Sequence, residues 1–196
     1  MNRNKNVLVA SVALLLALAT HQVQAWQIQT TPARSPQEKL LVDEFEKRAK
    51  EYVKLREQLE EKMAKLSKEA KPEEIEAHKK ELQTRVQAAR NGARPGNIFT
   101  PEAAAFIRSK TKEEFKGKER AELRKTVLVE SETKAVPLRV NYPYPDSQEQ
   151  LEMPPTLLLQ LPQLPKQLRF RFVGRNMLLV DRENGLIVDY MTNALP

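Results

Sequence analysis

Carboxylates are the most abundant side chains in this chain that could take part in acid–base or metal chemistry. The 196 residues include 26 Asp and Glu but no Cys, and of the two His only His78 lies after residue 25. Nucleophilic catalysis of the Ser/His or Cys/His type needs an imidazole beside the nucleophile, and a transition-metal site needs several imidazole or thiolate ligands. The five glycines form no phosphate-binding pattern, which disfavours a nucleotide site. We therefore expect no metal, no cofactor and no enzymatic activity.

Two carboxylates differ from the rest because each follows a run of apolar, strand-like residues. These are Asp181 and Asp189, whereas nearly all the others belong to Lys/Glu-rich helical patterns that are usually solvated. Arg169 and Arg171 alternate along a neighbouring predicted strand, and opposite charges on adjacent strands stabilise a sheet. We interpret these four residues as cross-strand charge pairs rather than as acid–base catalysts.

The first 25 residues have the pattern of a secretory signal peptide. Arg3 and Lys5 precede an apolar run of 13 residues from Val7 to Ala19, and Val23-Gln24-Ala25 is a small-residue cleavage site. This run is shorter than a membrane-spanning helix requires, although an uncleaved anchor is the alternative interpretation. We predict a bacterial Sec-type signal peptide over residues 1–25, cleaved after Ala25. The mature chain would then be periplasmic or secreted and would have no transmembrane segment.

Positive charge is concentrated in one middle segment of the chain. Residues 79–125 hold 13 basic and 6 acidic side chains, whereas residues 36–78 hold 10 and 12. A basic segment in an exported chain favours an anionic partner, such as anionic lipid, lipopolysaccharide or an acidic protein surface, and nucleic acid is not expected. The alternative is a solvated helix surface that lysines keep soluble. The candidate interaction surface comprises Arg85, Arg90, Arg94, Arg108, Lys112, Lys116, Arg120 and Arg124.

Residues 36–130 are predicted to be helical and to follow a flexible leader over residues 26–35. Ser35, Pro36 and Glu38 have the pattern of a capped helix start. Apolar residues then recur from position 41 to position 70 with a period near 3.6, which predicts one helix over residues 36–70. A helix of this length needs a partner along its apolar stripe.

Two further helices are predicted to supply that partner. The second runs from Pro72 to Asn91-Gly92, which is a typical helix terminator. The third begins at Thr100-Pro101, breaks near Ser109 and is capped again at Thr111. Because the second helix is short, it can cover only half of the first, and the third is expected to cover the rest. The prediction is an antiparallel helical hairpin within a three-helix region.

Residues 135–196 are predicted to form a Pro-rich lead-in and a small antiparallel β-meander. Alternating apolar residues and a proline predict an edge strand over residues 136–140, and a short element is expected within 156–161. Turns are expected at Gly174 and at Asn184-Gly185. The three strands of the meander are predicted at residues 168–173, 177–181 and 186–190. The fold class is therefore α+β, with the helical region first and the meander last.

The C-terminal segment also resembles a known motif. Leu161-Pro-Gln-Leu-Pro165 precedes Phe172-Val-Gly-Arg-Asn-Met-Leu-Leu-Val-Asp181 and then Gly185-Leu-Ile-Val-Asp189. This order, over about residues 161–191, resembles the C-terminal motif of the periplasmic nickel/cobalt-homeostasis family of small exported bacterial proteins. Members of that family have shorter upstream regions, often with histidines, and the chain as a whole resembles uncharacterised secreted bacterial proteins that share this tail. The resemblance implies a compartment and a fold.

These features lead us to expect a non-enzymatic exported protein that binds another envelope component through its helical arms. The partner would be a protein or an anionic envelope component. One alternative is a holdase-like periplasmic chaperone, which would likewise use exposed helical arms with a positive surface. Another is an accessory factor in nickel/cobalt homeostasis, which the resemblance of the tail alone implies.

Overall fold

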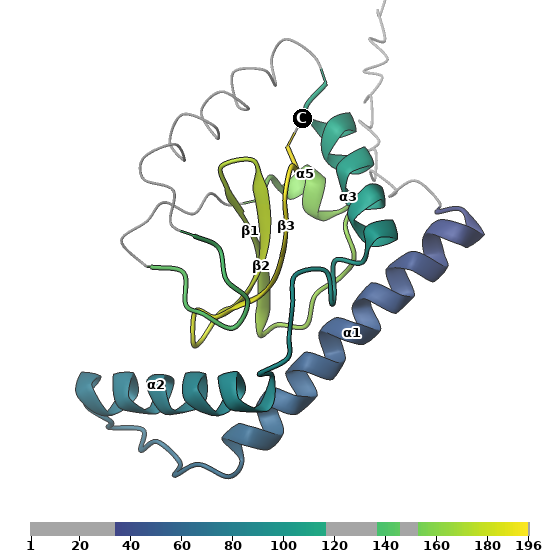
Figure 1. The fold of residues 1–196 in the computed structure, drawn as a ribbon. Coiled ribbons are helices and arrows are strands. Elements are labelled where there is room, and N and C mark those ends of the chain that lie inside the picture. Colours follow the sequence, from purple (N-terminus) through teal and green to yellow (C-terminus); the bar gives the residue numbers. More distant parts are fainter. Residues whose placement is uncertain (1–33, 117–136, 146–152, 196) are drawn as a thin grey trace, which may run out of the picture. The chain divides into compact units, whose positions relative to one another are not determined.

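The computed structural model describes residues 34–116, 137–145 and 153–195, and these belong to one compact unit of the chain. Helices come first and a three-stranded antiparallel sheet comes last, so the α+β prediction is confirmed (Figure 1). The predicted signal peptide and most of the leader lie outside the described residues, as do Arg120 and Arg124. The elements are α1 (Pro36–Glu60), α2 (Pro72–Ala89), α3 (Pro101–Glu114), α5 (Pro155–Leu158), β1 (Leu168–Val173), β2 (Asn176–Asp181) and β3 (Ile187–Met191).

The start of α1 has the predicted capping box. The backbone N–H of Glu38 donates to Ser35 Oγ at 3.2 Å, and the Glu38 carboxylate accepts from the backbone N–H of Ser35 at 2.9 Å. These two bonds satisfy amides that have no partner within the helix. The other oxygen of Glu38 binds Lys110 Nζ of α3 at 2.8 Å, so the same carboxylate also links the two helices.

The pKa of Glu38 predicts a pH dependence of stability. The hydrogen bond from Lys110, then that from the Ser35 backbone, lowers this pKa from 4.5 to about 2. A depressed pKa in the folded state means that the contribution of Glu38 is present above pH 4.5 and is lost as the pH falls toward 2. Glu38→Gln should therefore flatten the pH dependence of the melting temperature in this window. Glu51→Gln, on the exposed face of α1, is the control, and equal curves for wild type and Glu38→Gln would contradict this assignment.

The predicted helix over residues 36–70 is too long, because α1 ends at Glu60. The chain tightens into a turn in which the N–H of Met63 donates to the carbonyl of Glu60 at 2.9 Å. This turn places Met63 in the core, where its side chain is 7% exposed. No glycine or proline marks the end of the helix before Pro72, so the end depends on the burial of Met63 rather than on local sequence.

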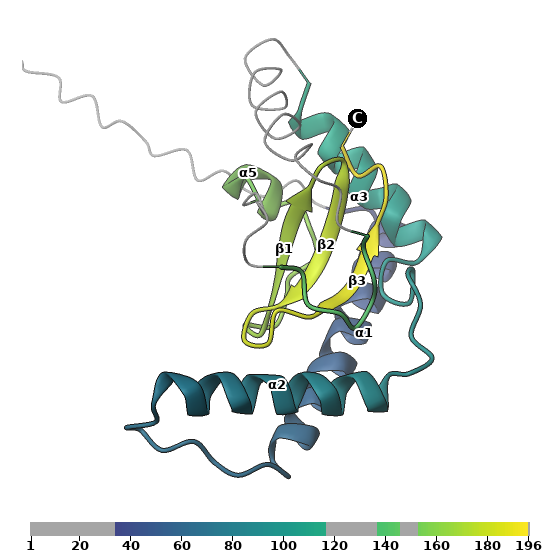
Figure 2. The same cartoon turned by 60° about the vertical axis from the view of Figure 1, so that its left-hand side comes forward.

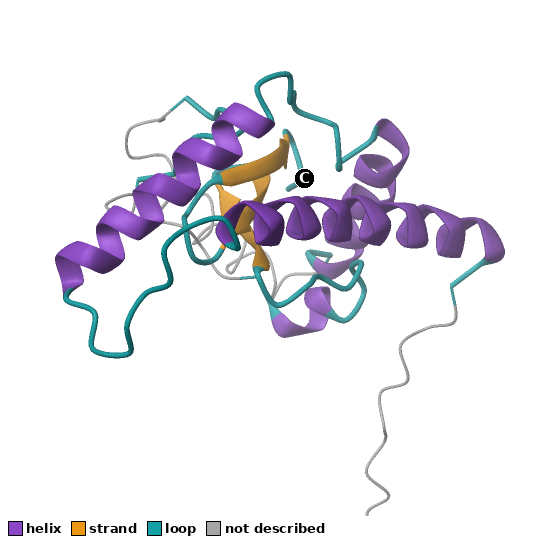
Figure 3. Cartoon of the chain, turned by 90° about the horizontal axis from the view of Figure 1, so that it is seen from below, coloured by secondary structure: helices purple, strands orange, loops and turns teal. Residues whose placement is uncertain are grey.

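The second and third helices begin where they were predicted to begin. The end of α2 at Ala89 agrees with the predicted terminator, and α2 runs obliquely across the C-terminal part of α1 (Figures 1 and 3). The predicted break near Ser109 is wrong, since α3 is continuous to Glu114. The hydroxyls of Ser109 and Thr111 donate to the carbonyls of Phe106 and Ile107 within the helix, at 2.7 and 2.6 Å, instead of capping a new one.

The β-meander follows the predicted boundaries closely. Its strand order is β1-β2-β3, with antiparallel pairing on both sides of β2. Gly174 and Gly185 make the turns with positive φ values of 55° and 72°, a region that glycine enters without strain. The short element near residue 156 is the single-turn helix α5.

The predicted edge strand over residues 136–140 is wrong for its described part, because residues 137–140 form no strand. Instead, Asn141 adopts a positive φ of 64° and turns the chain. The chain then pairs briefly with β3: the N–H of Asn141 donates to the carbonyl of Ile187 at 2.8 Å, and Pro143 forms an isolated bridge with Leu186. This contact covers the start of the free edge of β3.

The apolar stripe of α1 packs on the sheet as well as on the other helices. The Phe45 ring lies 5.4 Å from that of Phe99, in the loop before α3, and 6.0 Å from that of Phe170 in β1. Phe115, after α3, packs edge-on against Phe172 of β1. As Figures 1 and 2 show, α1 and α3 lie over the same face of the sheet. The third helix is therefore only one of the partners of the stripe.

Candidate functional site

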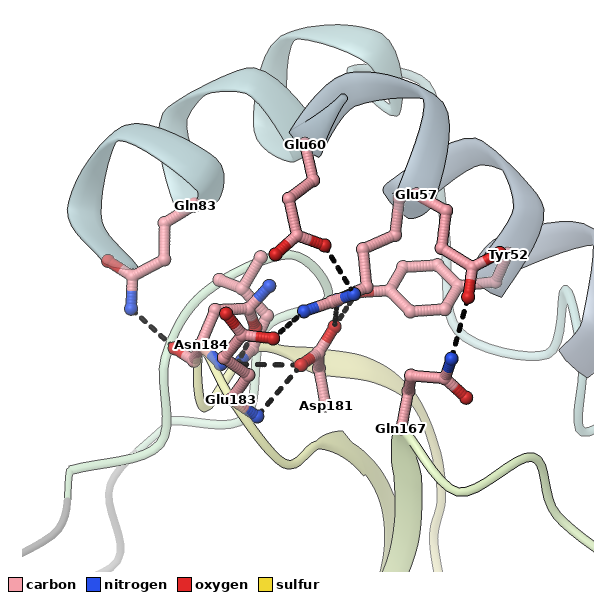
Figure 4. A network of polar contacts seen from close by, with 10 residues as sticks. Tyr52, Glu57, Glu60, Gln83, Gln167, Asp181, Glu183 and Asn184 are labelled. Atoms are coloured by element: carbon pink, nitrogen blue, oxygen red, sulfur yellow. Dashed lines mark hydrogen bonds and ion pairs between the residues drawn. The ribbon is translucent and has the colours of Figure 1, made fainter. Parts of the chain in front are cut away.

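Asp181 lies at the centre of a buried polar network where α1 meets the end of β2 (Figure 4). Its Oδ2 atom accepts from the Tyr52 hydroxyl at 2.8 Å and lies 3.1 Å from Arg56 Nε. Its Oδ1 atom accepts from the backbone N–H groups of Glu183 and Asn184, at 3.0 and 3.3 Å. Both oxygens of this fully buried carboxylate are therefore satisfied, as burial of a charge requires.

Arg56 supplies the positive charge of this network. Its side chain is 4% exposed, and besides Asp181 it binds Glu60 of α1 at 2.9 Å and Glu183 of the β2–β3 turn. Gln83 of α2 donates to the carbonyl of Asn184 at 2.5 Å, so the same turn is held by two helices. Burial, followed by the negative charge of Asp181, raises the pKa of Tyr52 well above its ordinary value, and the phenol stays a hydrogen-bond donor.

Asp189, the second aspartate that the sequence singled out, is enclosed by backbone amides. Its carboxylate accepts from the N–H groups of Gly96, Ile98 and Phe99 at 2.6–2.9 Å, and from its neighbour Tyr190 at 2.8 Å. Burial raises the pKa of Asp189, and the amide donors act in the opposite direction. This carboxylate holds the loop before α3 against β3, and its acceptor positions are occupied.

The predicted pairing of Arg169 and Arg171 with these aspartates is wrong. The strand register places Asp181 opposite Leu168, whereas Arg169 lies opposite Val180. Because side chains alternate between the two faces of a sheet, the arginines lie on the face opposite to Asp181. The true partner of Asp181 is Arg56, which lies more than a hundred residues away in the sequence.

The structure divides the candidate interaction surface into structural and exposed residues. Arg90 is structural: its guanidinium donates to Asn141 Oδ1 at 2.6 Å and to the Val188 carbonyl at 3.0 Å, and it lies 4.9 Å from the centre of the Tyr52 ring. Arg108 is exposed but donates to the carbonyls of Thr192 and Asn193, at 3.1 and 3.2 Å, which holds the C-terminal tail.

The remaining described members of the candidate surface lie on several elements. Arg85 pairs with Glu81 along α2 at 2.6 Å, and Lys116 pairs with Glu113 at the end of α3 at 3.3 Å. Lys112 is exposed on α3, and Arg94 is exposed in the loop after α2. Exposed pairs of this kind contribute little to stability. Of the described members of the candidate surface, Arg94 is the one that lines a groove together with other residues suited to binding.

This groove, which we call the Arg94 groove, lies between the loop after α2 and the segment before the β3 bridge. Its volume is about 470 Å³. The side chains that could bind a partner are Arg94, Arg139, Tyr142 and Tyr190. Arg139 stacks on the Tyr142 ring with its guanidinium carbon 3.9 Å from the ring centre, and Tyr142 is 45% exposed. No carboxylate is among the described residues that line this groove.

The sequence analysis missed Arg139, Tyr142 and Tyr190 as candidate binding residues. Arg139 was assigned to an edge strand and Tyr190 to the third strand of the meander, and the segment that begins at Tyr142 was expected to be extended or to turn. The available signal was the spacing of Arg139 and Tyr142, a basic residue three positions before a tyrosine in a segment rich in proline. That spacing allows the two side chains to stack when the chain turns, as it does at Asn141.

His78 lines a different, acidic cavity of about 490 Å³. The same cavity is lined by four glutamates: Glu57, Glu60, Glu61 and Glu183. Two of them, Glu60 and Glu183, are bound to Arg56. Among the residues that the structure describes, no three His, Cys, Asp or Glu side chains are placed to hold a metal ion. Within the same residues, no helix has both the length and the apolar character needed to cross a bilayer.

Comparison with known proteins found no protein family whose model matches this chain, no similar curated protein and no similar solved structure. The resemblance of the C-terminal segment to the nickel/cobalt-homeostasis motif stays a prediction.

Proposed function

We propose that this is an exported, non-enzymatic protein that binds another component of the bacterial envelope through the Arg94 groove. The observation that carries the proposal is the exposed Tyr142 ring, stacked by Arg139 beside Arg94. Tyrosine and arginine are among the residues enriched where binding energy concentrates in protein interfaces. The partner would present an anionic surface, because the charged residues described in this groove are arginines.

The buried carboxylates support a structural rather than a catalytic role. Asp181 and Asp189 use their oxygens on the partners given above. A third buried carboxylate, Glu114, accepts from the Thr156 hydroxyl at 2.5 Å and from Gln160 at 3.2 Å, and joins α3 to α5. A general acid or base must reach a proton on a substrate, whereas these groups are bound to the protein itself.

The two alternative functions, a chaperone and a nickel/cobalt accessory factor, would each require a structural feature other than those described above. A holdase-like chaperone would present apolar surface on its helical arms, whereas the Phe45 side of α1 packs on the sheet. A nickel or cobalt accessory role would require a cluster of ligands, and the described residues contain no group of three such side chains. The groove instead favours binding of an anionic macromolecule.

Site-specific photo-crosslinking in intact bacteria tests this proposal. A photoreactive phenylalanine analogue in place of Tyr142 should capture one dominant partner, because the Tyr142 ring is exposed within the groove. The same analogue in place of Lys54, exposed on α1, is the matched control and should capture less.

Charge reversal makes the test specific. Arg94→Glu combined with Arg139→Glu should abolish the crosslink from position 142, since like charges at an interface repel. Lys47→Glu combined with Lys50→Glu, on α1, should leave it intact. A smear of products, or a crosslink that survives charge reversal in the groove, would contradict the proposed function.

A further inference from the structure

Strand β1 is an edge of the sheet. In the described part of the chain it pairs with β2 alone, whereas the segment around Pro143 pairs with the start of the outer edge of β3. An edge strand offers a row of backbone N–H and C=O groups that another strand can bind. The two edges of this sheet are therefore different, and within the described residues the β1 edge has no bridge of this kind.

The register shows which backbone groups point to this edge. The N–H of Arg182 donates to the carbonyl of Gln167 at 2.8 Å, so Gln167 and Arg182 are a hydrogen-bonded pair directly before the first pair of the ladder. Hydrogen-bonded pairs alternate along antiparallel strands. The backbone groups of Leu168, Phe170 and Phe172 therefore point away from β2, toward the outer edge.

A groove of about 490 Å³, the β1 groove, lies along this edge. The chain from Pro162 to Lys166 and β1 form it, with Met153 and Leu158 contributing apolar surface. The charged side chains among its described lining residues are all basic: Lys166, Arg169, Arg171 and Arg182. Such a groove combines backbone hydrogen-bonding groups, apolar surface and positive charge.

Among the described residues, two arginines of this groove contact backbone carbonyls of β1. Arg182 Nε donates to the Leu168 carbonyl at 3.0 Å, and Arg171 Nη1 donates to the Phe170 carbonyl at 3.2 Å. Arg169 Nε is buried without a hydrogen-bond partner. Two arginines thus contact carbonyls that the register directs to the edge, and a third has unused hydrogen-bonding capacity.

We propose that the β1 groove binds an extended acidic peptide segment of another protein, which adds to the sheet as a strand beside β1. The backbone groups of Phe170 and Phe172 would pair with the peptide backbone, as in strand addition to other sheets. Carboxylates on alternate peptide residues would bind Arg169 and Lys166. Arginine and carboxylate make strong, geometrically specific pairs, which selects acidic over neutral peptides. This proposal does not rest on the Arg94 groove.

Peptide titration by fluorescence anisotropy tests the proposal with the purified protein. The probe is a labelled peptide of alternating valine and glutamate, and its matched control has glutamine in place of each glutamate. The acidic peptide should bind about tenfold or more tightly than the neutral one, with an affinity that falls as salt increases. A third peptide, acidic but N-methylated on alternate amides along one edge, should lose binding because it cannot pair with β1.

Variants of the protein locate the binding to this groove. Arg169→Gln combined with Lys166→Gln should weaken binding of the acidic peptide by about tenfold, with the far-ultraviolet circular dichroism and melting temperature confirming that the variant folds. Lys47→Gln combined with Lys50→Gln, on α1, and Arg94→Gln combined with Arg139→Gln should bind as the wild type does.

Four results would overturn this inference: no binding of the acidic peptide, equal affinity for the neutral peptide, equal affinity for the N-methylated peptide, or equal loss in the α1 variant. Because the Arg94 groove variant is included, failure of this inference and failure of the proposed function would be seen separately.

Discussion

Replacement of Arg56 by methionine should lower the free energy of unfolding by about 3–5 kcal/mol, the cost of leaving a buried charge without its partner. Methionine keeps much of the length of the side chain but removes the guanidinium. Asp181, which is fully buried, would then keep the Tyr52 hydroxyl and two backbone amides as its partners but would lose the only positive charge that the described residues place against it. Urea denaturation followed by circular dichroism measures the change.

Arg85→Met is the matched control for this prediction. Arg85 also lies on a helix and pairs with a glutamate one turn away, but both side chains of that pair are substantially exposed. Its replacement should change the free energy of unfolding by about 0.5 kcal/mol or less. A cost below about 1 kcal/mol for Arg56→Met would mean that Asp181 is not a buried charge compensated by this arginine.

Replacement of Phe45 by alanine should also be severely destabilising, by about 3–5 kcal/mol. Phe45 is 1% exposed and its ring contacts the rings of Phe99 and Phe170, so it joins α1 to the loop before α3 and to β1. Truncation would leave a cavity at the contact between the helix and the sheet. The denaturant midpoint and the slope of the transition should be measured together, so that a loss of cooperativity is seen as a change of slope.

Leu40→Ala provides the comparison for Phe45. Leu40 lies five residues earlier on α1 and is 71% exposed, so its truncation should change stability by about 0.5 kcal/mol or less. If Leu40→Ala were as costly as Phe45→Ala, the face of α1 assigned to the core would be wrong.

The meander was predictable because its signals are local. Alternation of Leu168, Phe170 and Phe172 identifies the buried face of β1, and the glycine turns fix the pairing. Helix starts were predictable for the same reason, since Ser35 and Thr100 cap their own helices. The end of α1 was not, because it depends on Met63 packing into a core that other segments complete.

The buried network was not predicted from the sequence, because the charge of Arg56 favours an exposed position. Arg56 continues the helical stripe of Phe45, Ala49 and Tyr52 by a step of four, so its position alone indicated burial. Its residue type favoured an exposed position, and an arginine is buried only when it is paired. The pairing with Asp181 joins distant parts of the chain, which no local pattern predicts.

Some residues of the two binding grooves were identified from the sequence. Arg94 was identified from the concentration of positive charge, but Arg139 was assigned to an edge strand. The turn at Asn141 brings Arg139 onto the ring of Tyr142. Arg169 and Arg171 were recognised as neighbours on one face of a strand. Their assignment to the aspartates failed because the register directs Asp181 and Arg169 to opposite faces.

Arg56 and Asp181 join α1 and the meander into one folded unit, and we propose that binding surfaces lie in the grooves rather than on a separate helical arm. A double-mutant cycle of Arg56→Met and Asp181→Asn tests it most directly, because the neutral amide no longer requires the guanidinium. The double variant should be less destabilised than the sum of the single variants by at least about 1 kcal/mol. Additivity within about 0.5 kcal/mol would contradict a direct contact between these two side chains.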